Sequence, residues 1–179
     1  FAFSSKAMYQ IDPHNMVIEA TYEGFGISES RSALVLSGQL YLANKNGVYI
    51  FGSGKFRLLS DRIQNAWDFL FYDLPSSIPT LQNNKKYNNL MVMFKNLGPN
   101  SKDLAPNYCF VYSLDKGRWD RWDMPLNGVN STCLDGDGNV LMSALGSDVA
   151  TVNSQTGVAK DTNGVIIEKP HSIYKMHAG

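Results

Sequence analysis

Leu40-Tyr41-Leu42-Ala43 is a short apolar run, and two runs of the same kind follow it at intervals of fifty residues: Leu90-Met91-Val92-Met93 and Val140-Leu141-Met142-Ser143. A polar turn precedes each run. A second short strand follows each run after a connection, at residues 48–51, 109–112 and 149–152, and residues 7–11 add an earlier copy of that second strand. Self-similarity at such a period indicates a repeat architecture, in which every unit is one small supersecondary structure.

Each unit contains enough strand-like segments for four strands. A turn rich in Gly, Pro, Asp, Asn or Ser follows the second strand and leads into a third, at residues 16–22, 56–59, 118–122 and 158–161. Another β run precedes the apolar run, at residues 33–36, 67–72 and 130–134. Four short antiparallel strands per unit of about 40–50 residues are typical of β-propeller blades. A β-sandwich also has short alternating strands, but it would not explain why their order repeats in step.

We therefore predict an all-β fold: a β-propeller, or part of one, built from four-stranded antiparallel blades. The blades are expected at roughly residues 1–27 (partial), 28–64, 65–127 and 128–170. All 179 residues then form one propeller segment, and because the chain begins at Phe1 within an apolar stretch, we expect a piece of a longer polypeptide.

The composition narrows the function classes. Sixteen basic residues balance sixteen acidic ones, so no net field attracts nucleic acid or anionic lipid. The apolar runs are too short to cross a bilayer as helices. A hydrophobic fraction of 44% with 18% charged residues is that of a globular chain and not of a disordered one.

No combination of residues resembles a catalytic or metal site. The histidines His14, His171 and His177 are far apart, and Asp135-Gly136-Asp137-Gly138-Asn139 lacks the later ligands of a calcium loop. Cys109 and Cys133 lie in expected strands and are interpreted as small hydrophobic residues. No nucleophile elbow is present. The sequence predicts a protein that is not an enzyme, with no catalytic residues, no metal and no cofactor.

Two long stretches of the predicted blade at residues 65–127 are candidates for contacts with other subunits. Residues 73–89 and 96–107 are predicted to be irregular loops that carry apolar residues. Because exposed apolar surface costs about 25 cal/mol per Å², these side chains should pack on the blades or against a neighbouring subunit. The candidate interface residues are Leu74, Pro75, Tyr87, Leu97, Leu104 and Pro106.

The three tryptophans are predicted to have packing roles. Trp67 is expected to start a strand, although residues 61–68 also have a helical pattern. Trp119 and Trp122 are three residues apart, a spacing that does not place both indoles on one face of a flat strand, so we expect a bulge or bend between them. Aromatic side chains between blades bury large areas. A ligand platform formed by these rings is the alternative.

Three phrases, taken in order, resemble those of a known family. The first is Glu23-Gly24-Phe25-Gly26-Ile27-Ser28, the second runs from Gly47-Val48-Tyr49 to Ser60-Asp61-Arg62-Ile63-Gln64, and the third from Tyr112-Ser113-Leu114 through Gly117 and Trp119 to Trp122. Together they resemble the tail nozzle, or tail tubular, proteins of short-tailed bacteriophages. The likeness covers roughly residues 20–165, and the family's proteins are much longer than this chain.

The resemblance implies a structural virion protein of the phage tail. Such a subunit would carry a propeller, assemble into a homo-oligomeric ring with neighbouring tail proteins, and surround the conduit through which DNA leaves, without catalysis. The alternative is a secreted or cell-surface propeller that binds a glycan or peptide. A third possibility, a sialidase-like hydrolase, lacks the arginine cluster and tyrosine nucleophile that it would need.

Overall fold

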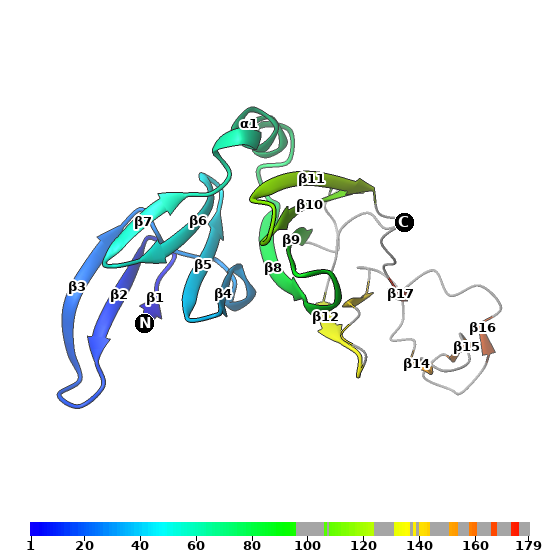
Figure 1. The fold of residues 1–179 in the computed structure, drawn as a ribbon, viewed down its shortest axis with the longest axis horizontal. Coiled ribbons are helices and arrows are strands. Elements are labelled where there is room, and N and C mark those ends of the chain that lie inside the picture. Colours follow the sequence, from blue (N-terminus) through cyan, green and yellow to red (C-terminus); the bar gives the residue numbers. More distant parts are fainter. Residues whose placement is uncertain are drawn as a thin grey trace. The chain divides into compact units, whose positions relative to one another are not determined.

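The computed structural model describes residues 1–95, 106, 108–123, 131–136, 138, 140–143, 151–153, 158–160, 166–167 and 173–175. The described elements are mostly β-strands in antiparallel sheets, and few helices accompany them. The chain divides into two compact units, Phe1–Leu81 and Gln82–Gly179 (Figure 1). The all-β prediction is confirmed at this level.

The first sheet of the first unit has three strands, β1 (Ala2–Phe3), β2 (Ala7–Asp12) and β3 (Val17–Glu23), in that order. The turn between β2 and β3 is built by Asp12, whose carboxylate accepts the backbone N–H of His14 at 2.9 Å and the amide Nδ2 of Asn15 at 2.7 Å. The register shifts between Gln10 and Ile11, which marks a β-bulge in the hairpin. The edge strands of this sheet are β1 and β3.

The second sheet is a four-stranded meander. It contains β4 (Ala33–Leu36), β5 (Gln39–Asn44), β6 (Gly47–Gly52) and β7 (Lys55–Leu58), hydrogen-bonded in chain order after the short 3-10 helix η1 (Ser30–Ser32). Two of its turns are two-residue turns with positive φ at both positions, Ser37-Gly38 and Ser53-Gly54. This is the geometry of type I′ turns, whose twist matches that of the strands they join.

These two sheets pack against each other through one apolar cluster. Met8 from β2, Leu40 from β5 and Phe51 from β6 are its buried members. Partly buried residues surround them: Phe3, Tyr22, Phe25, Ala33 and Phe56. Several of the rings meet edge to face, such as Tyr22 and Phe51 with centroids 5.2 Å apart. Each such pair contributes about 0.5–1.5 kcal/mol beyond the area it buries.

A helix follows where a strand was predicted. The 3-10 helix η2 (Asp61–Ile63) leads directly into α1 (Gln64–Asp73), so the prediction of a strand over residues 67–72 is wrong. The reason lies in which side chains are buried. Trp67 and Leu70 are buried and lie three residues apart, whereas Phe69 and Tyr72 are exposed, which is the pattern of a helix with one apolar face. The run Phe69-Leu70-Phe71-Tyr72 is too short for periodicity alone to distinguish the two structures.

The third sheet repeats the order of the second. Its strands are β8 (Ile78–Asn84), β9 (Asn89–Lys95), β10 (Tyr108–Ser113) and β11 (Arg118–Asp123), with the 3-10 helix η3 (Lys85–Tyr87) between β8 and β9. The strand β8 begins in the first unit and ends in the second. Residues 73–89 were predicted to be a loop, and β8 corrects that prediction. The strand was not recognised in the sequence because it ends in three polar residues, Gln82-Asn83-Asn84.

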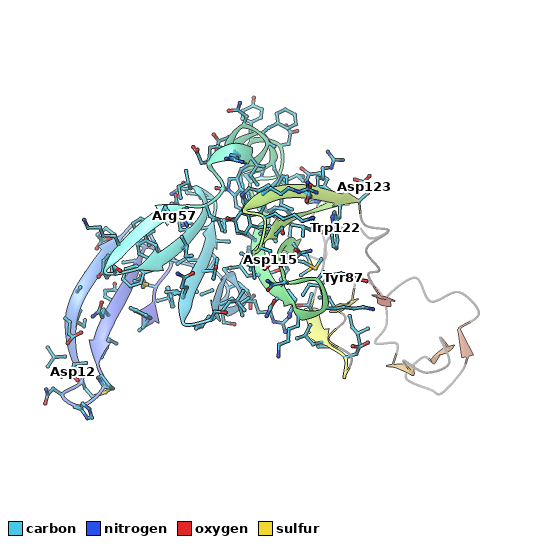
Figure 2. All side chains as sticks on the ribbon, viewed as in Figure 1. Asp12, Arg57, Tyr87, Asp115, Trp122 and Asp123 are labelled. Carbon is cyan, nitrogen blue, oxygen red and sulfur yellow. The ribbon has the colours of Figure 1, made fainter. Side chains whose placement is uncertain are left out.

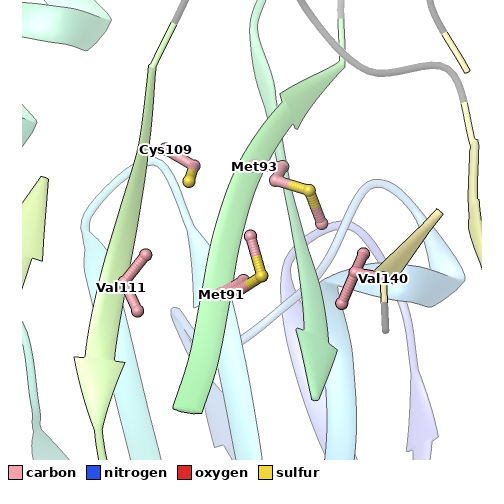
Figure 3. Packing of buried hydrophobic residues seen from close by; sticks show 5 residues of the cluster. All are labelled: Met91, Met93, Cys109, Val111 and Val140. Carbon is pink, nitrogen blue, oxygen red and sulfur yellow. The ribbon is translucent and has the colours of Figure 1, made fainter. Parts of the chain in front are cut away.

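In the second unit, β12 (Ser131–Leu134) and β13 (Val140–Ser143) pack on the third sheet. Figure 3 shows Met91 and Met93 on β9, Cys109 and Val111 on β10, and Val140 on β13 in one buried cluster. Every one of these side chains is at most 1% exposed. Trp122 and Leu134 are partly buried against the cluster.

The last strands pair differently from the prediction. The strand β13 lies beside β12 as expected, but its other neighbour is β17 (Ile173–Lys175). The predicted neighbour was a strand at residues 149–152. The described part of that region, β14 (Thr151–Asn153), instead joins β15 (Val158–Lys160) and β16 (Ile166–Ile167) in a separate sheet. The runs at residues 40 and 90 therefore occupy the same position in their four-stranded sheets, whereas the third run belongs to a three-stranded sheet.

Candidate functional site

The longest phrase of the family resemblance forms a hydrogen-bonded network that we call the hairpin clamp, consisting of Ser60, Gln64, Trp67 and the turn at residues 45–48. The hydroxyl of Ser60 is its centre and is fully buried. The Ser60 Oγ accepts the backbone N–H of Val48 at 3.0 Å and donates to Oε1 of Gln64 at 3.2 Å. A serine at this place thus joins β6 to the first turn of α1.

Helix α1 supplies the other half of the clamp. The Nε2 of Gln64 donates to the backbone oxygen of Asn46 at 3.1 Å and to Oδ1 of Asp68 at 2.8 Å. The indole Nε1 of Trp67 donates to the backbone oxygen of Lys45 at 3.1 Å. Both backbone oxygens belong to the turn between β5 and β6, so the packing role predicted for Trp67 includes a hydrogen bond.

Gly47 completes the clamp by having no side chain. Its φ of 148° is disfavoured for other residues, and a Cβ would lie 2.7 Å from both Leu58 Cδ1 and Ser60 Oγ. Gly47 and Gln64 stand at the two ends of the phrase, and both are needed for the hairpin clamp although they are far apart in sequence.

The phrase around Gly26 also has a structural role. A Cβ on Gly26 would lie 2.3 Å from the backbone nitrogen of Lys6, so the two backbones can approach only at glycine. The Nδ2 of Asn44 donates to the backbone oxygen of Gly24 at 3.1 Å. Phe25 stacks on Phe56 with ring centroids 3.8 Å apart. These contacts attach the segment to both sheets of the first unit.

The third phrase forms the turn between β10 and β11. Gly117 has a φ of 61° and its N–H donates to the Ser113 oxygen at 2.9 Å. Trp119 packs on Tyr112 with ring centroids 5.1 Å apart. Trp122 lies on the opposite face, against the cluster of Figure 3, and the register of β10 with β11 is continuous. The strand therefore has no bulge here, and the prediction of a bulge or bend is wrong: the two indoles lie on opposite faces of a regular strand.

The candidate interface residues are divided between the two compact units of the chain. Leu74 caps the C-terminus of α1 and is half-buried, Pro75 is exposed, Tyr87 in η3 is half-buried and Pro106 is buried. Leu97 and Leu104 lie outside the described residues, as do His171 and His177.

Sequence reasoning missed the exposed aromatic pair Phe69 and Tyr72, which the helical spacing from Trp67 and Leu70 could have indicated.

In the part of the chain that the structure describes, the titratable groups do not converge on a site. Among the residues that the structure describes, no group of three or more His, Cys, Asp or Glu side chains could hold a metal ion. Burial raises the pKa of the Cys109 thiol to about 12, so the thiol stays protonated at neutral pH. The backbone N–H of His14, together with Asn15, lowers the pKa of the Asp12 carboxyl, which accepts both hydrogen bonds in its turn.

Near the calcium-like sequence, the described residues form a turn. The N–H of Gly138 donates to the Asp135 oxygen at 3.0 Å, while Asp137 and Asn139 lie outside the described residues. Across the described part of the chain, no helix is long and apolar enough to cross a membrane.

Comparison with known proteins gives a likeness of fold. No family model and no curated protein matches the chain. The extracellular domain of a putative one-component system from B. thetaiotaomicron superposes with a TM-score of 0.56 at 15% identity, over 97% of this chain and 24% of that chain. The extracellular domain of a putative hybrid two-component system from the same organism gives a TM-score of 0.41 at 15% identity, over 93% and 19%. The chain thus spans about a quarter of the length of the first of these structures.

Proposed function

We propose that the chain is a segment of a β-propeller that acts by binding other protein subunits and has no catalytic role. The supporting observation is the repeated packing of sheets. Consecutive antiparallel sheets follow one another along the chain, and within each unit neighbouring sheets bury apolar faces against each other. Blades of a propeller pack in this way.

As the specific function we propose a subunit of the tail nozzle of a short-tailed bacteriophage, assembled as a homo-oligomeric ring with neighbouring tail proteins around the DNA conduit. The support is the ordered series of three phrases. Their glycines, serine and glutamine have defined structural tasks in the clamp and the turns. The residues that carry the resemblance are thus the ones that hold the predicted blade together. This favours a shared architecture over an accidental likeness in composition.

A second candidate is a secreted or cell-surface propeller that binds a glycan or peptide. The observation that favours it is the likeness of fold to an extracellular domain of a putative one-component system. In this case the exposed aromatic residues would contact a ligand instead of a subunit.

The two candidates differ in assembly. Electron microscopy of the full-length protein should show a ring with cyclic symmetry if the nozzle proposal is right. A monomer that binds immobilised glycans or peptides would contradict that proposal and support the second candidate. A monomer with neither property would contradict both.

A further inference from the structure

We propose that helix α1 is a contact surface for a second copy of this chain, and that it receives the basic edge strand β7 of that copy. The inference deepens the proposed function, on which it rests, because it takes the neighbouring subunit to be a copy in a ring. The surface, called here the α1 patch, consists of Asp68, Phe69, Tyr72, Asp73 and Pro75.

The aromatic residues of the patch are unusually exposed. Phe69 is 65% and Tyr72 is 84% exposed, whereas Trp67 and Leu70 on the same helix are buried and Phe71 is half-buried. Phe69 and Tyr72 are three positions apart, so the two rings lie on the same face of the helix. Pro75, just after the helix, is also exposed and extends this apolar surface.

The charge of the helix defines the chemistry of the partner. The sequence of α1 contains two aspartates and no lysine or arginine, and no basic residue lies in its last turn. The C-terminal end of a helix carries a partial negative charge, which Asp73 increases. The faces of Phe69 and Tyr72 are negative as well. An ammonium or guanidinium group from outside would therefore be attracted to this end of α1.

The chain itself presents such groups on β7. Lys55 and Arg57 are both exposed and lie two residues apart, so they project from the same face of the strand at a separation of about 6.6 Å. The strand is the outer edge of its sheet, and Figure 2 marks Arg57 on it. Within the described residues neither side chain has an ion-pair partner. A second copy can thus provide two cations for the two carboxylates of the α1 patch.

The contact has a direction: α1 of one copy meets β7 of the next. Such a heterologous contact leaves a free α1 patch at one end of a dimer and a free β7 at the other, and it closes only when a ring is complete. In the contact, the guanidinium of Arg57 would face the carboxylate of Asp73 while Phe69 and Tyr72 are removed from water.

Charge reversal in the full chain tests the pairing. Asp73→Arg and Arg57→Asp should each weaken self-association about tenfold, because each places like charges opposite one another. The variant carrying both substitutions should recover association to within about threefold of the unchanged chain, since the pair is restored with its signs exchanged. Sedimentation velocity over a range of concentrations measures the dissociation constant, and the urea midpoint of each variant reports whether the fold is retained.

Two controls sharpen the result. Glu23→Arg makes the same change of charge at an exposed position on β3 and should leave association unchanged. Tyr72→Ala, which removes an exposed ring without altering charge, should weaken association and leave the urea midpoint unchanged. The proposal is overturned if the double variant stays as weak as the single ones, or if neither reversal affects association. A ring that persists in microscopy despite both reversals would overturn this contact alone, whereas a monomer at every concentration would overturn the nozzle assembly as well.

Discussion

Replacing Ser60 by alanine is the sharpest test of the hairpin clamp. The substitution removes one oxygen, and with it the acceptor of the Val48 N–H and the donor to Gln64. Val48 and Ser60 are both fully buried, so no water can replace the lost partner. A buried N–H left without an acceptor costs about 1–3 kcal/mol. We therefore expect the free energy of unfolding to fall by about 2 kcal/mol.

Equilibrium unfolding in urea measures this loss. With a urea dependence of about 2 kcal/mol per molar, the midpoint should fall by about 1 M at an unchanged slope. Ser76→Ala, at an exposed turn, is the matched control and should stay within about 0.5 kcal/mol of the unchanged chain. Gln64→Ala should be less harmful in the Ser60→Ala background than alone, because the two residues share a hydrogen bond. Equal effects of Ser60→Ala and Ser76→Ala would refute the clamp.

Three further predictions follow from single sites. Gly26→Ala should lower the free energy of unfolding by about 3 kcal/mol, because its Cβ would collide with the backbone of Lys6. Gly52→Ala, whose Cβ would have nothing within 4 Å, should cause no such loss, and equal urea midpoints of the two variants would contradict this prediction. A thiol reagent at pH 8 should modify the exposed Cys133 and spare Cys109 until the chain is unfolded; rapid reaction of two thiols in the folded protein would disprove the burial of Cys109. The pKa of Asp12 is lowered from 3.8 in the folded state, so the stability that its carboxylate contributes is present above that value and is lost as the pH falls through the folded pKa. In the variant Asp12→Asn the urea midpoint should therefore fall less steeply at acid pH than in the unchanged chain.

The repeat was visible in the sequence because buried strands are short, apolar and evenly spaced. The second strands of the two four-stranded sheets, β5 and β9, contain the runs at residues 40 and 90 that defined the period. The helix α1 was missed because its apolar run is as short as a strand. The strand β8 was missed because Asn84 is buried despite its polar side chain, and polarity usually indicates exposure.

The candidate site was less accessible to sequence reasoning than the fold. The clamp joins Gly47, Ser60 and Gln64 through hydrogen bonds that have no fixed spacing along the chain. Its phrase could be recognised as a resemblance, but its physical reason appears only when the turn and the helix are seen together. The bulge predicted between Trp119 and Trp122 is absent because each indole packs on its own face of a regular strand, and the spacing alone did not show which faces are covered.

The outer strands of the sheets have a consequence for solubility. An edge strand offers unpaired N–H and C=O groups to any other extended chain, and is thus a starting point for aggregation. The edges β3, β7 and β11 carry charged side chains along their length: Glu19 and Glu23, Lys55 and Arg57, and Arg118, Asp120, Arg121 and Asp123. On β11 the charges are arranged as two ion pairs, Arg118–Asp120 and Arg121–Asp123. Strands with such side chains add poorly to one another, so many copies can be brought close together while their sheets remain separate.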